Sequence, residues 1–236
     1  MKNNIKAVFF DLDGTLLPMD LTEFMREYFK ILYDALDGER YTKEDLYNGV
    51  HDAVFEMMTK NDGIKKNAQH FSDSLEARFP GQSKAIIERI NKIYSNEYLN
   101  LRALCGFDET AAGAVRALHD AGYRLVLATN PVFPLSAQLE RLSWTGVDAS
   151  LFDYVTSYEN SRSAKPMKEY YEYLLSDLGL SANEAIMVGN DTRDDMIAEE
   201  VGLDTFLLTA CLINRDGRDI SKYKNGDFSD LLSYLL

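Results

Sequence analysis

Short apolar runs that alternate with helical patterns are the feature of this sequence that most constrains its fold. Five runs have the length and continuous apolar character of strands buried on both faces: residues 6–10, 124–128, 154–157, 185–188 and 205–208. Helical patterns separate the later runs and end just before a glycine: residues 108–121, 167–178 and 194–201. This alternation predicts an α/β fold in which helices cover both faces of a parallel sheet.

A segment of about 80 residues between the first and second predicted strands interrupts this pattern. It contains no strand-like run, and its four helical stretches lie at about residues 20–36, 42–60, 64–79 and 82–98. We therefore expect two domains. Residues 1–18 and 102–236 would form the α/β core, and residues 19–101 would form an all-helical cap.

Composition narrows the class of partner. The 236 residues include 38 acidic and 25 basic side chains, for a net charge of −13, and 46% are hydrophobic, which is enough for a folded core. The acidic excess argues against nucleic acid as a partner, because Lys and Arg make most phosphate-backbone contacts. It does not argue against a small anion held at a local site. The oligomeric state stays open.

The sequence has the features of a cytoplasmic protein. No apolar run approaches the roughly 18 residues that a membrane span needs, and the first residues lack the pattern of a signal peptide. The two cysteines, Cys105 and Cys211, lie far apart and provide no disulfide framework. We expect neither a membrane nor a nucleic acid as partner.

The segment Asp11-Leu12-Asp13-Gly14-Thr15 directly follows the first predicted strand. Ligands of open α/β sheets bind beyond the carboxyl ends of the strands. Two carboxylates one residue apart repel each other unless a cation or a proton offsets their charge, and Gly14 permits the bend that would bring both to one site. A purely structural interpretation also exists, because Asp-Gly is a common turn pair.

Polar residues follow two further predicted elements. Thr129 and Asn130 end the second strand, where a hydroxyl and backbone amides can bind a phosphoryl oxygen, although such a segment is more often only a turn. Lys165 precedes a helix; it is either a solvated loop charge or, if it reaches the carboxylates, their counter-charge.

Three carboxylates lie in residues 189–195, after the strand at 185–188. Capping and the helix dipole account for one or two of them. The segment also lies beyond a strand end, as Asp11 and Asp13 do. Oxygen ligands from Asp11, Asp13 and Asp191 would suit Mg²⁺, which typically binds a few carboxylates together with water and phosphate.

These four segments, in this order, resemble the motifs of the haloacid dehalogenase-like (HAD) superfamily of hydrolases. The helical insert resembles the cap of its phosphoglycolate phosphatase and β-phosphoglucomutase-like subclass. The resemblance extends from Lys6 to Leu208. It implies a Rossmann-like core with an all-helical cap, Mg²⁺ as cofactor, and a small phosphorylated metabolite as substrate. It also implies hinges near residues 16–19 and 102–107, where the chain passes between the two domains.

The resemblance assigns a role to each motif. Asp11 would be the nucleophile that forms an aspartyl-phosphate, and Asp13 would act as general acid and then general base. The carboxylates of Asp11 and Asp191, with the backbone carbonyl of Asp13, would bind the metal, and Lys165 would neutralise Asp11. The residues that would bind the phosphoryl group are Leu12, Gly14, Thr15, Thr129, Asn130 and Lys165. Asn190, where the family often has Asp or Glu, and Asp195 would support the site.

Asp13 favours a phosphatase over a dehalogenase, because a halide leaves without needing a proton. Three alternatives stay open: a phosphosugar mutase of the same fold, a non-catalytic aspartyl-phosphate switch, and a binding module. The cap lysines Lys60, Lys65 and Lys66 are most simply surface charges. They would meet an anionic substrate, or supply the amine that phosphonate cleavage requires, only if their turn faces the core. The sequence does not identify the substrate.

Overall fold

The computed structural model describes residues 4–38 and 40–236; residues 1–3, which open the predicted core domain, and Glu39 lie outside the described residues. The core is a parallel sheet of six strands in the order β3-β2-β1-β4-β5-β6. The strands are β1 (Ala7–Phe10), β2 (Arg124–Leu127), β3 (Tyr154–Val155), β4 (Ala185–Gly189), β5 (Asp204–Leu208) and β6 (Asn225–Gly226). The five predicted strands are therefore confirmed, and the two-residue β6 is added at the edge.

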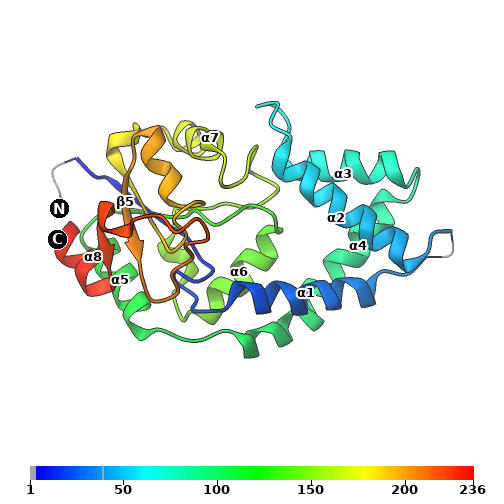
Figure 1. Ribbon diagram of the computed structural model, residues 1–236, viewed down its shortest axis with the longest axis horizontal. Coiled ribbons are helices and arrows are strands. Elements are labelled where there is room, and N and C mark those ends of the chain that lie inside the picture. The colour runs from blue at the N-terminus through cyan, green and yellow to red at the C-terminus, as the bar shows by residue number, and fades with distance from the viewer. Residues whose placement is uncertain (1–3, 39) are drawn as a thin grey trace.

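Alternate residues of β1 face opposite layers of the core, because successive side chains of a strand point to opposite faces. Val8 and Phe10 pack in one hydrophobic cluster with α5 (Glu109–Asp120), α6 (Leu135–Trp144) and α8 (Phe228–Leu235). Ala7 and Phe9 pack in the other cluster with α7 (Lys168–Leu178). Helices therefore cover both faces of the sheet, as predicted (Figure 1).

The segment expected as a helix at residues 194–201 is instead a short 3₁₀-helix, η4 (Met196–Val201). The Asp195 carboxylate accepts hydrogen bonds from the backbone of the preceding turn. The carbonyl of Asp191 also accepts from the amides of both Asp195 and Met196. Residues 191–195 therefore form a hydrogen-bonded turn, and the helix begins only at Met196.

The cap contains the four expected helices: α1 (Leu21–Ala35), α2 (Lys43–Thr59), α3 (Asn67–Arg78) and α4 (Ser83–Tyr94). The last predicted stretch ends earlier than expected, and the chain continues as the 3₁₀-helix η1 (Glu97–Leu104). Helix α1 buries Phe24, Tyr28 and Leu32, which are spaced one turn apart on one face. In Figure 1, α2, α3 and α4 stand apart from the sheet, and α1 extends from the core toward them.

The two connections between core and cap run side by side. The amide of Gly106 donates to the carbonyl of Pro18 at 2.7 Å, and Met19 and Cys105 form an isolated antiparallel bridge. This pairing lies at the two segments that the sequence marked as hinges.

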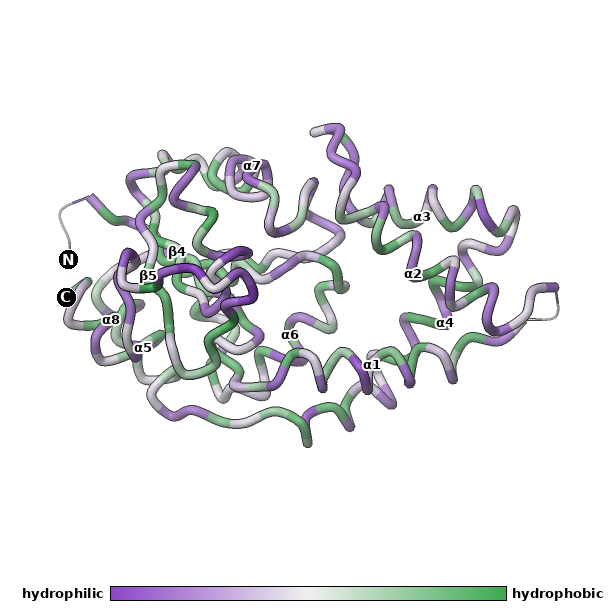
Figure 2. The backbone as a smooth tube through the Cα atoms, viewed as in Figure 1, coloured by the Kyte–Doolittle hydropathy of each residue, from purple (hydrophilic) through white to green (hydrophobic). Residues whose placement is uncertain are grey.

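Among the described residues, no helix is long and apolar enough to cross a membrane. Figure 2 shows hydrophilic and hydrophobic residues interspersed along the cap helices.

Candidate active site

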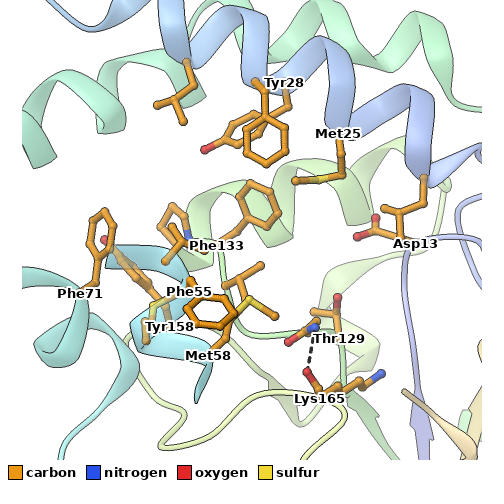
Figure 3. Close-up of a pocket in the computed structure, with 18 of the residues that line it drawn as sticks. Asp13, Met25, Tyr28, Phe55, Met58, Phe71, Thr129, Phe133, Tyr158 and Lys165 are labelled. Carbon is orange, nitrogen blue, oxygen red and sulfur yellow. Dashed lines mark hydrogen bonds between the residues drawn. The ribbon is translucent and has the colours of Figure 1, made fainter. Parts of the chain in front are cut away.

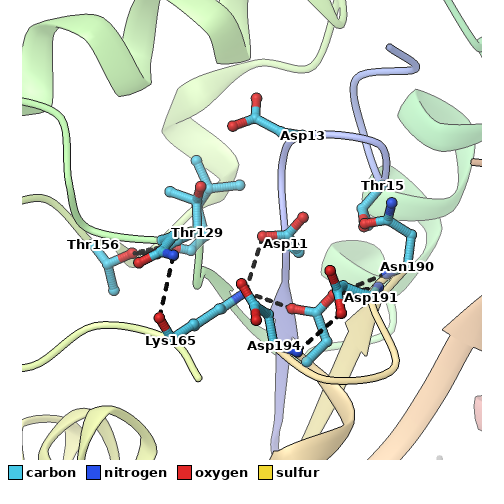
Figure 4. A network of polar contacts seen from close by, with 12 residues as sticks. Asp11, Asp13, Thr15, Thr129, Thr156, Lys165, Asn190, Asp191 and Asp194 are labelled. Carbon is cyan, nitrogen blue, oxygen red and sulfur yellow. Dashed lines mark hydrogen bonds and ion pairs between the residues drawn. The ribbon is translucent and has the colours of Figure 1, made fainter. Parts of the chain in front are cut away.

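Lys165 joins two of the predicted site residues in the interior. Its ammonium group donates to Asp11 Oδ1 at 2.9 Å (Figure 4). It also donates to Asp195 Oδ1 at 2.6 Å. Asp11 follows β1, and its amide donates to the carbonyl of Val188 on the neighbouring β4 at 2.9 Å. Side chains that are 154 positions apart in the sequence therefore meet at the carboxyl edge of the sheet, where open α/β sheets bind ligands.

Burial and the neighbouring charges shift the pKa values of Lys165, Asp11 and Asp195 in opposite directions. Burial acts to lower the pKa of Lys165, but Asp11 and Asp195 outweigh it and hold that pKa well above its usual value. Burial raises the pKa of Asp11, and the Lys165 ammonium opposes the rise. Burial likewise raises the pKa of Asp195 to about 6 against the effect of Lys165. Lys165 is therefore a permanent cation beside the predicted nucleophile.

Asp195 also shapes the turn that carries Asp191. Its Oδ2 atom accepts from the amides of Asn190 at 3.0 Å and Asp191 at 2.9 Å. Gly189 has no space for a side chain, because a Cβ atom there would overlap the Asp195 carboxylate. Asp195 thus contacts both Lys165 and the turn that carries the predicted metal ligand.

The side chain of Asn190 connects three loops through hydrogen bonds. Its Nδ2 donates to the carbonyl of Cys211 at 2.6 Å, and its Oδ1 accepts from the Thr15 hydroxyl at 3.0 Å. Gly14 has a φ of +84°, and a Cβ atom at Gly14 would overlap the Asn190 amide. An amide suits this position better than the family's usual acid, because a carboxylate has no proton to donate to Cys211.

The loop after β1 uses its own polar groups internally. The Gly14 amide donates to Leu17 at 2.8 Å and the Thr15 amide to Leu12 at 3.2 Å, while the side chain of Leu12 is fully buried. The backbone amides of Gly14 and Thr15 therefore shape the loop, and phosphate contacts of these two residues stay a prediction. Leu12 would contact phosphate through its backbone, because its side chain is buried.

Thr129 and Asn130 lie beside Lys165 and line the same cavity as Asp11. The carbonyl of Thr129 accepts from the Thr156 hydroxyl at 2.7 Å, which fixes the backbone here (Figure 4). Asn130 Nδ2 donates to the carbonyl of Lys165 at 3.5 Å. Its buried Oδ1 atom has no hydrogen-bond partner among the described residues. The position beyond the second strand is therefore polar and faces the reaction site.

Asp13 pairs with an arginine that the sequence analysis missed. Arg141 on α6 is 1% exposed, and its Nη1 atom lies 3.2 Å from Asp13 Oδ2. The guanidinium also lies 4.5 Å from the ring centre of Phe133. Burial raises the pKa of Asp13, and Arg141 opposes this. The pattern of α6 gave no signal, because an arginine next to Glu140 resembles a solvated helix face.

The three carboxylates expected to share one metal ion do not form such a group. Across residues 4–38 and 40–236, no three His, Cys, Asp or Glu side chains are placed to hold a metal. The Asp13 carboxylate pairs with Arg141. The acidic side chains that remain are those of Asp11 and Asp191, and the backbone carbonyl of Asp13 is the third ligand that the family resemblance implies.

The chemistry of this donor set still fits Mg²⁺. Carboxylate and carbonyl oxygens are hard ligands of the kind that this ion prefers. The cavity end carries five carboxylates, from Asp11, Asp13, Asp191, Asp194 and Asp195. In the part of the chain that the structure describes, their cationic partners are Lys165, Arg141 and Arg215. The excess of negative charge favours a divalent cation.

Arg215, in the loop after β5, is a second residue that sequence reasoning missed. Its Nη1 atom lies 2.7 Å from Asp191 Oδ2, while Asp191 Oδ1 accepts from the amides of Arg193 and Asp194. Burial, together with Asp191 and Asp195, raises the pKa of Asp194 to about 6. Backbone amides thus orient Asp191 through its Oδ1 atom, and its Oδ2 atom faces the Arg215 guanidinium.

The chain belongs to the haloacid dehalogenase-like hydrolases, because the model of that family matches residues 5–202. This confirms the family resemblance. The phosphoglycolate phosphatase of Aliivibrio fischeri is 28% identical over an alignment that covers 100% of this chain and 97% of the relative. The pyrophosphatase PpaX of Bacillus pumilus is 24% identical and covers 86% of this chain and 83% of the relative.

Solved structures share the fold. A crystal structure described as a predicted phosphoglycolate phosphatase from Haemophilus somnus aligns with a TM-score of 0.63 at 20% identity, over 100% of both chains. The likeness covers core and cap together, so both belong to one known architecture.

Proposed function

We propose that this protein is a Mg²⁺-dependent phosphatase that hydrolyses a small phosphomonoester through an aspartyl-phosphate on Asp11. The observation that carries the proposal is the buried contact of Asp11 Oδ1 with Lys165, at the end of a cavity that Asp13 also lines. Relatives named as phosphatases, including that of Aliivibrio fischeri, support the class of reaction.

In the first step, Asp11 Oδ2 attacks phosphorus while Lys165 holds Oδ1. The bond from phosphorus to the ester oxygen breaks, and Asp13 gives that oxygen a proton. A general acid works best when its pKa lies near the working pH, so the burial that raises the pKa of Asp13 serves this step. Thr129, Asn130 and Lys165 would bind the phosphoryl oxygens.

In the second step, Asp13 removes a proton from water, which attacks the phosphorus of the aspartyl-phosphate. The acyl phosphate bond breaks, and Asp11 is regenerated with inorganic phosphate as product. Mg²⁺, bound by Asp11, Asp191 and the Asp13 carbonyl, would offset the negative charge of the phosphoryl group.

Both cysteines are free thiols, which is compatible with the cytoplasm as location.

The test is hydrolysis of para-nitrophenyl phosphate by the full chain, with Mg²⁺ and with excess EDTA. We expect chelation to abolish turnover and Asp11→Asn to lower kcat by roughly a thousandfold or more. Asp73→Asn, an exposed carboxylate on α3, is the matched control and should match the wild type. Circular dichroism would check that the variants fold.

Two results would contradict the proposal. Turnover that survives Asp11→Asn removes Asp11 as nucleophile. A long-lived phospho-Asp11 without turnover, detected by mass spectrometry, would instead indicate a non-catalytic switch.

A further inference from the structure

The cap lines its share of the catalytic cavity with apolar side chains. The cavity has a volume of about 350 Å³. Asp11, Thr129 and Lys165 lie at one end, and beyond them the lining includes Met25, Phe29, Val54, Phe55, Met58 and Phe71. Figure 3 shows these two parts facing the same space, with Asp13, Thr129 and Lys165 together at one side.

The described cap residues that line the cavity differ from its catalytic end in charge. Among the described cap residues that line the cavity, none is Lys, Arg, Asp or Glu. The polar ones are Tyr28, His51, Asn91 and Tyr94, and the hydroxyls of Tyr28 and Tyr94 bond to each other at 3.0 Å. His51 and Asn91 are then the polar side chains left to meet a substrate here.

The cap lysines point elsewhere. Lys60 pairs with Glu56 at 2.7 Å and Lys65 with Asp73 at 2.7 Å, both at the surface. Lys66 donates to the carbonyl of Asn160 at 2.6 Å, and none of the three lines the cavity. The idea that their turn offers an anion site, or an amine for phosphonate cleavage, is therefore wrong for this structure.

We propose, on the basis of the proposed function, that the substrate is a phosphomonoester whose alcohol part is uncharged and apolar, with an aromatic or branched aliphatic group. Such a group gains from leaving water for the apolar end of the cavity. A second anionic group there would lose its hydration without finding a cation. A cavity near the small end of the usual range for ligand sites suits a ring-sized group.

The experiment compares two esters with the same kind of leaving group, 3-phenylpropyl phosphate and 3-carboxypropyl phosphate, with the Mg²⁺-loaded enzyme. Both release a primary alcohol, so their chemical reactivity is closely matched and the tail decides the difference. We expect kcat/KM to be at least about tenfold higher for the phenyl tail. Equal values, or a preference for the carboxylate, would overturn the inference.

Val54→Lys and, separately, Met58→Lys place a cation in the apolar end of the cavity. We expect each to reduce the preference for the phenyl tail by about tenfold or to invert it. Ile64→Lys introduces the same charge at a residue that is 82% exposed and outside the cavity, and should leave the preference unchanged. A preference that neither Val54→Lys nor Met58→Lys changes would contradict a role of the cap cavity in selection.

Failure of the proposed function has a different signature. Acetyl phosphate is small and activated, so any phosphatase that works through Asp11 should hydrolyse it regardless of its tail preference. If acetyl phosphate and both esters resist hydrolysis, the proposed function fails. Calorimetry with 4-phenylbutylphosphonate and 4-carboxybutylphosphonate, which cannot be hydrolysed, still decides the inference. Binding of the phenyl compound that is no tighter than that of the carboxylate would overturn it.

Discussion

Arg141 carries a positive charge into the core, where Asp13 is its ion-pair partner at 3.2 Å. The rest of its surroundings is aromatic, with Phe133 at 4.5 Å and Phe24 at 5.9 Å from the guanidinium to the ring centres, and Gln138 accepts from Nη2. A buried charge is costly unless it is paired. We therefore interpret Arg141 as a positioning residue that holds the Asp13 carboxylate.

The substitution Arg141→Met should remove this pairing and leave Asp13 buried without its partner. We expect the free energy of unfolding, measured with urea at pH 7, to fall by about 3 kcal/mol. Adding Asp13→Asn should recover part of the loss, with a coupling of about 1–3 kcal/mol. Arg193→Met, at an exposed position, is the control. Strictly additive losses would argue against a direct interaction of Arg141 with Asp13.

Sequence reasoning found the residues that stand beside a predicted element at the reactive edge of the sheet and missed those whose local pattern is ordinary. Asp11 and Lys165 are recognisable because each follows or precedes a predicted element at the reactive edge of a sheet. Arg141 meets Asp13 only after the chain has folded. The use of Asn190 as a donor to Cys211 likewise depends on three loops that meet in space.

Helices α2 and α3 are joined by a polar cluster on Glu56. Its Oε1 atom accepts from Arg78 Nη2 at 2.6 Å, and its Oε2 atom accepts from Lys60 at 2.7 Å and from Ser74 at 3.0 Å. Hydrogen bonds from Arg78 first, then Lys60 and Ser74, lower the pKa of Glu56 to about 2. The cluster therefore stabilises the packing of these two helices only while Glu56 is ionised.

The sign of the pH effect follows from that lowered pKa. The contribution is complete above the ordinary pKa of 4.5 and is lost as the pH falls toward 2. We expect Glu56→Gln to lower the free energy of unfolding by about 1 kcal/mol at pH 7, a modest value because the cluster is partly exposed. The difference from the wild type should shrink at pH 4 and further at pH 3.

Urea unfolding at the three pH values measures this difference. Glu88→Gln, an exposed residue on α4, controls for general effects of charge. A difference that stays constant from pH 7 to pH 3 would mean that ionisation of Glu56 does not stabilise the cap.

Element boundaries followed from the sequence wherever local signals set them. Asp108 caps α5 and Gly179 ends α7 with a φ of +67°, and both signals are visible in the sequence. The helical pattern at residues 194–201 forms a 3₁₀-helix that ends at Gly202 as the glycine indicated, but the hydrogen bonds of the Asp195 carboxylate to the preceding turn are not visible in the local pattern.

At the scale of the whole molecule, backbone hydrogen bonds link the cap to the core at the paired connections and at the start of α3, and cap aromatic side chains also pack on Phe133 and Trp144 of the core. The paired connections at Pro18 and Gly106 form the first backbone contact. The start of α3 forms the second, where the amides of Asn67 and Ala68 donate at 2.8 Å each to the carbonyls of Ser161 and Tyr158. The first contact is covalently tethered, so entry of substrate by cap motion requires the second to break.

Asn67 is the residue on which that second contact depends most. It is fully buried, and its Nδ2 atom donates to the carbonyls of Pro131 at 3.2 Å and Ser163 at 3.1 Å. The substitution Asn67→Ala removes both bonds, which together contribute about 1–3 kcal/mol. Because 1.4 kcal/mol corresponds to a factor of ten, we expect the opened form to become about tenfold more populated.

Hydrogen exchange at the amides of residues 67 and 68 measures this opening, since both donate across the contact only when the cap is closed. We expect exchange there to be about tenfold faster in Asn67→Ala, with exchange in the strands of the core unchanged. Asp73→Ala on the same helix should leave these amides as in the wild type, because its surface ion pair with Lys65 contributes little. Unchanged exchange in Asn67→Ala would place the opening elsewhere, whereas faster exchange throughout the core would indicate general destabilisation. Only a local increase supports a cap that swings on its two connections and closes on the start of α3.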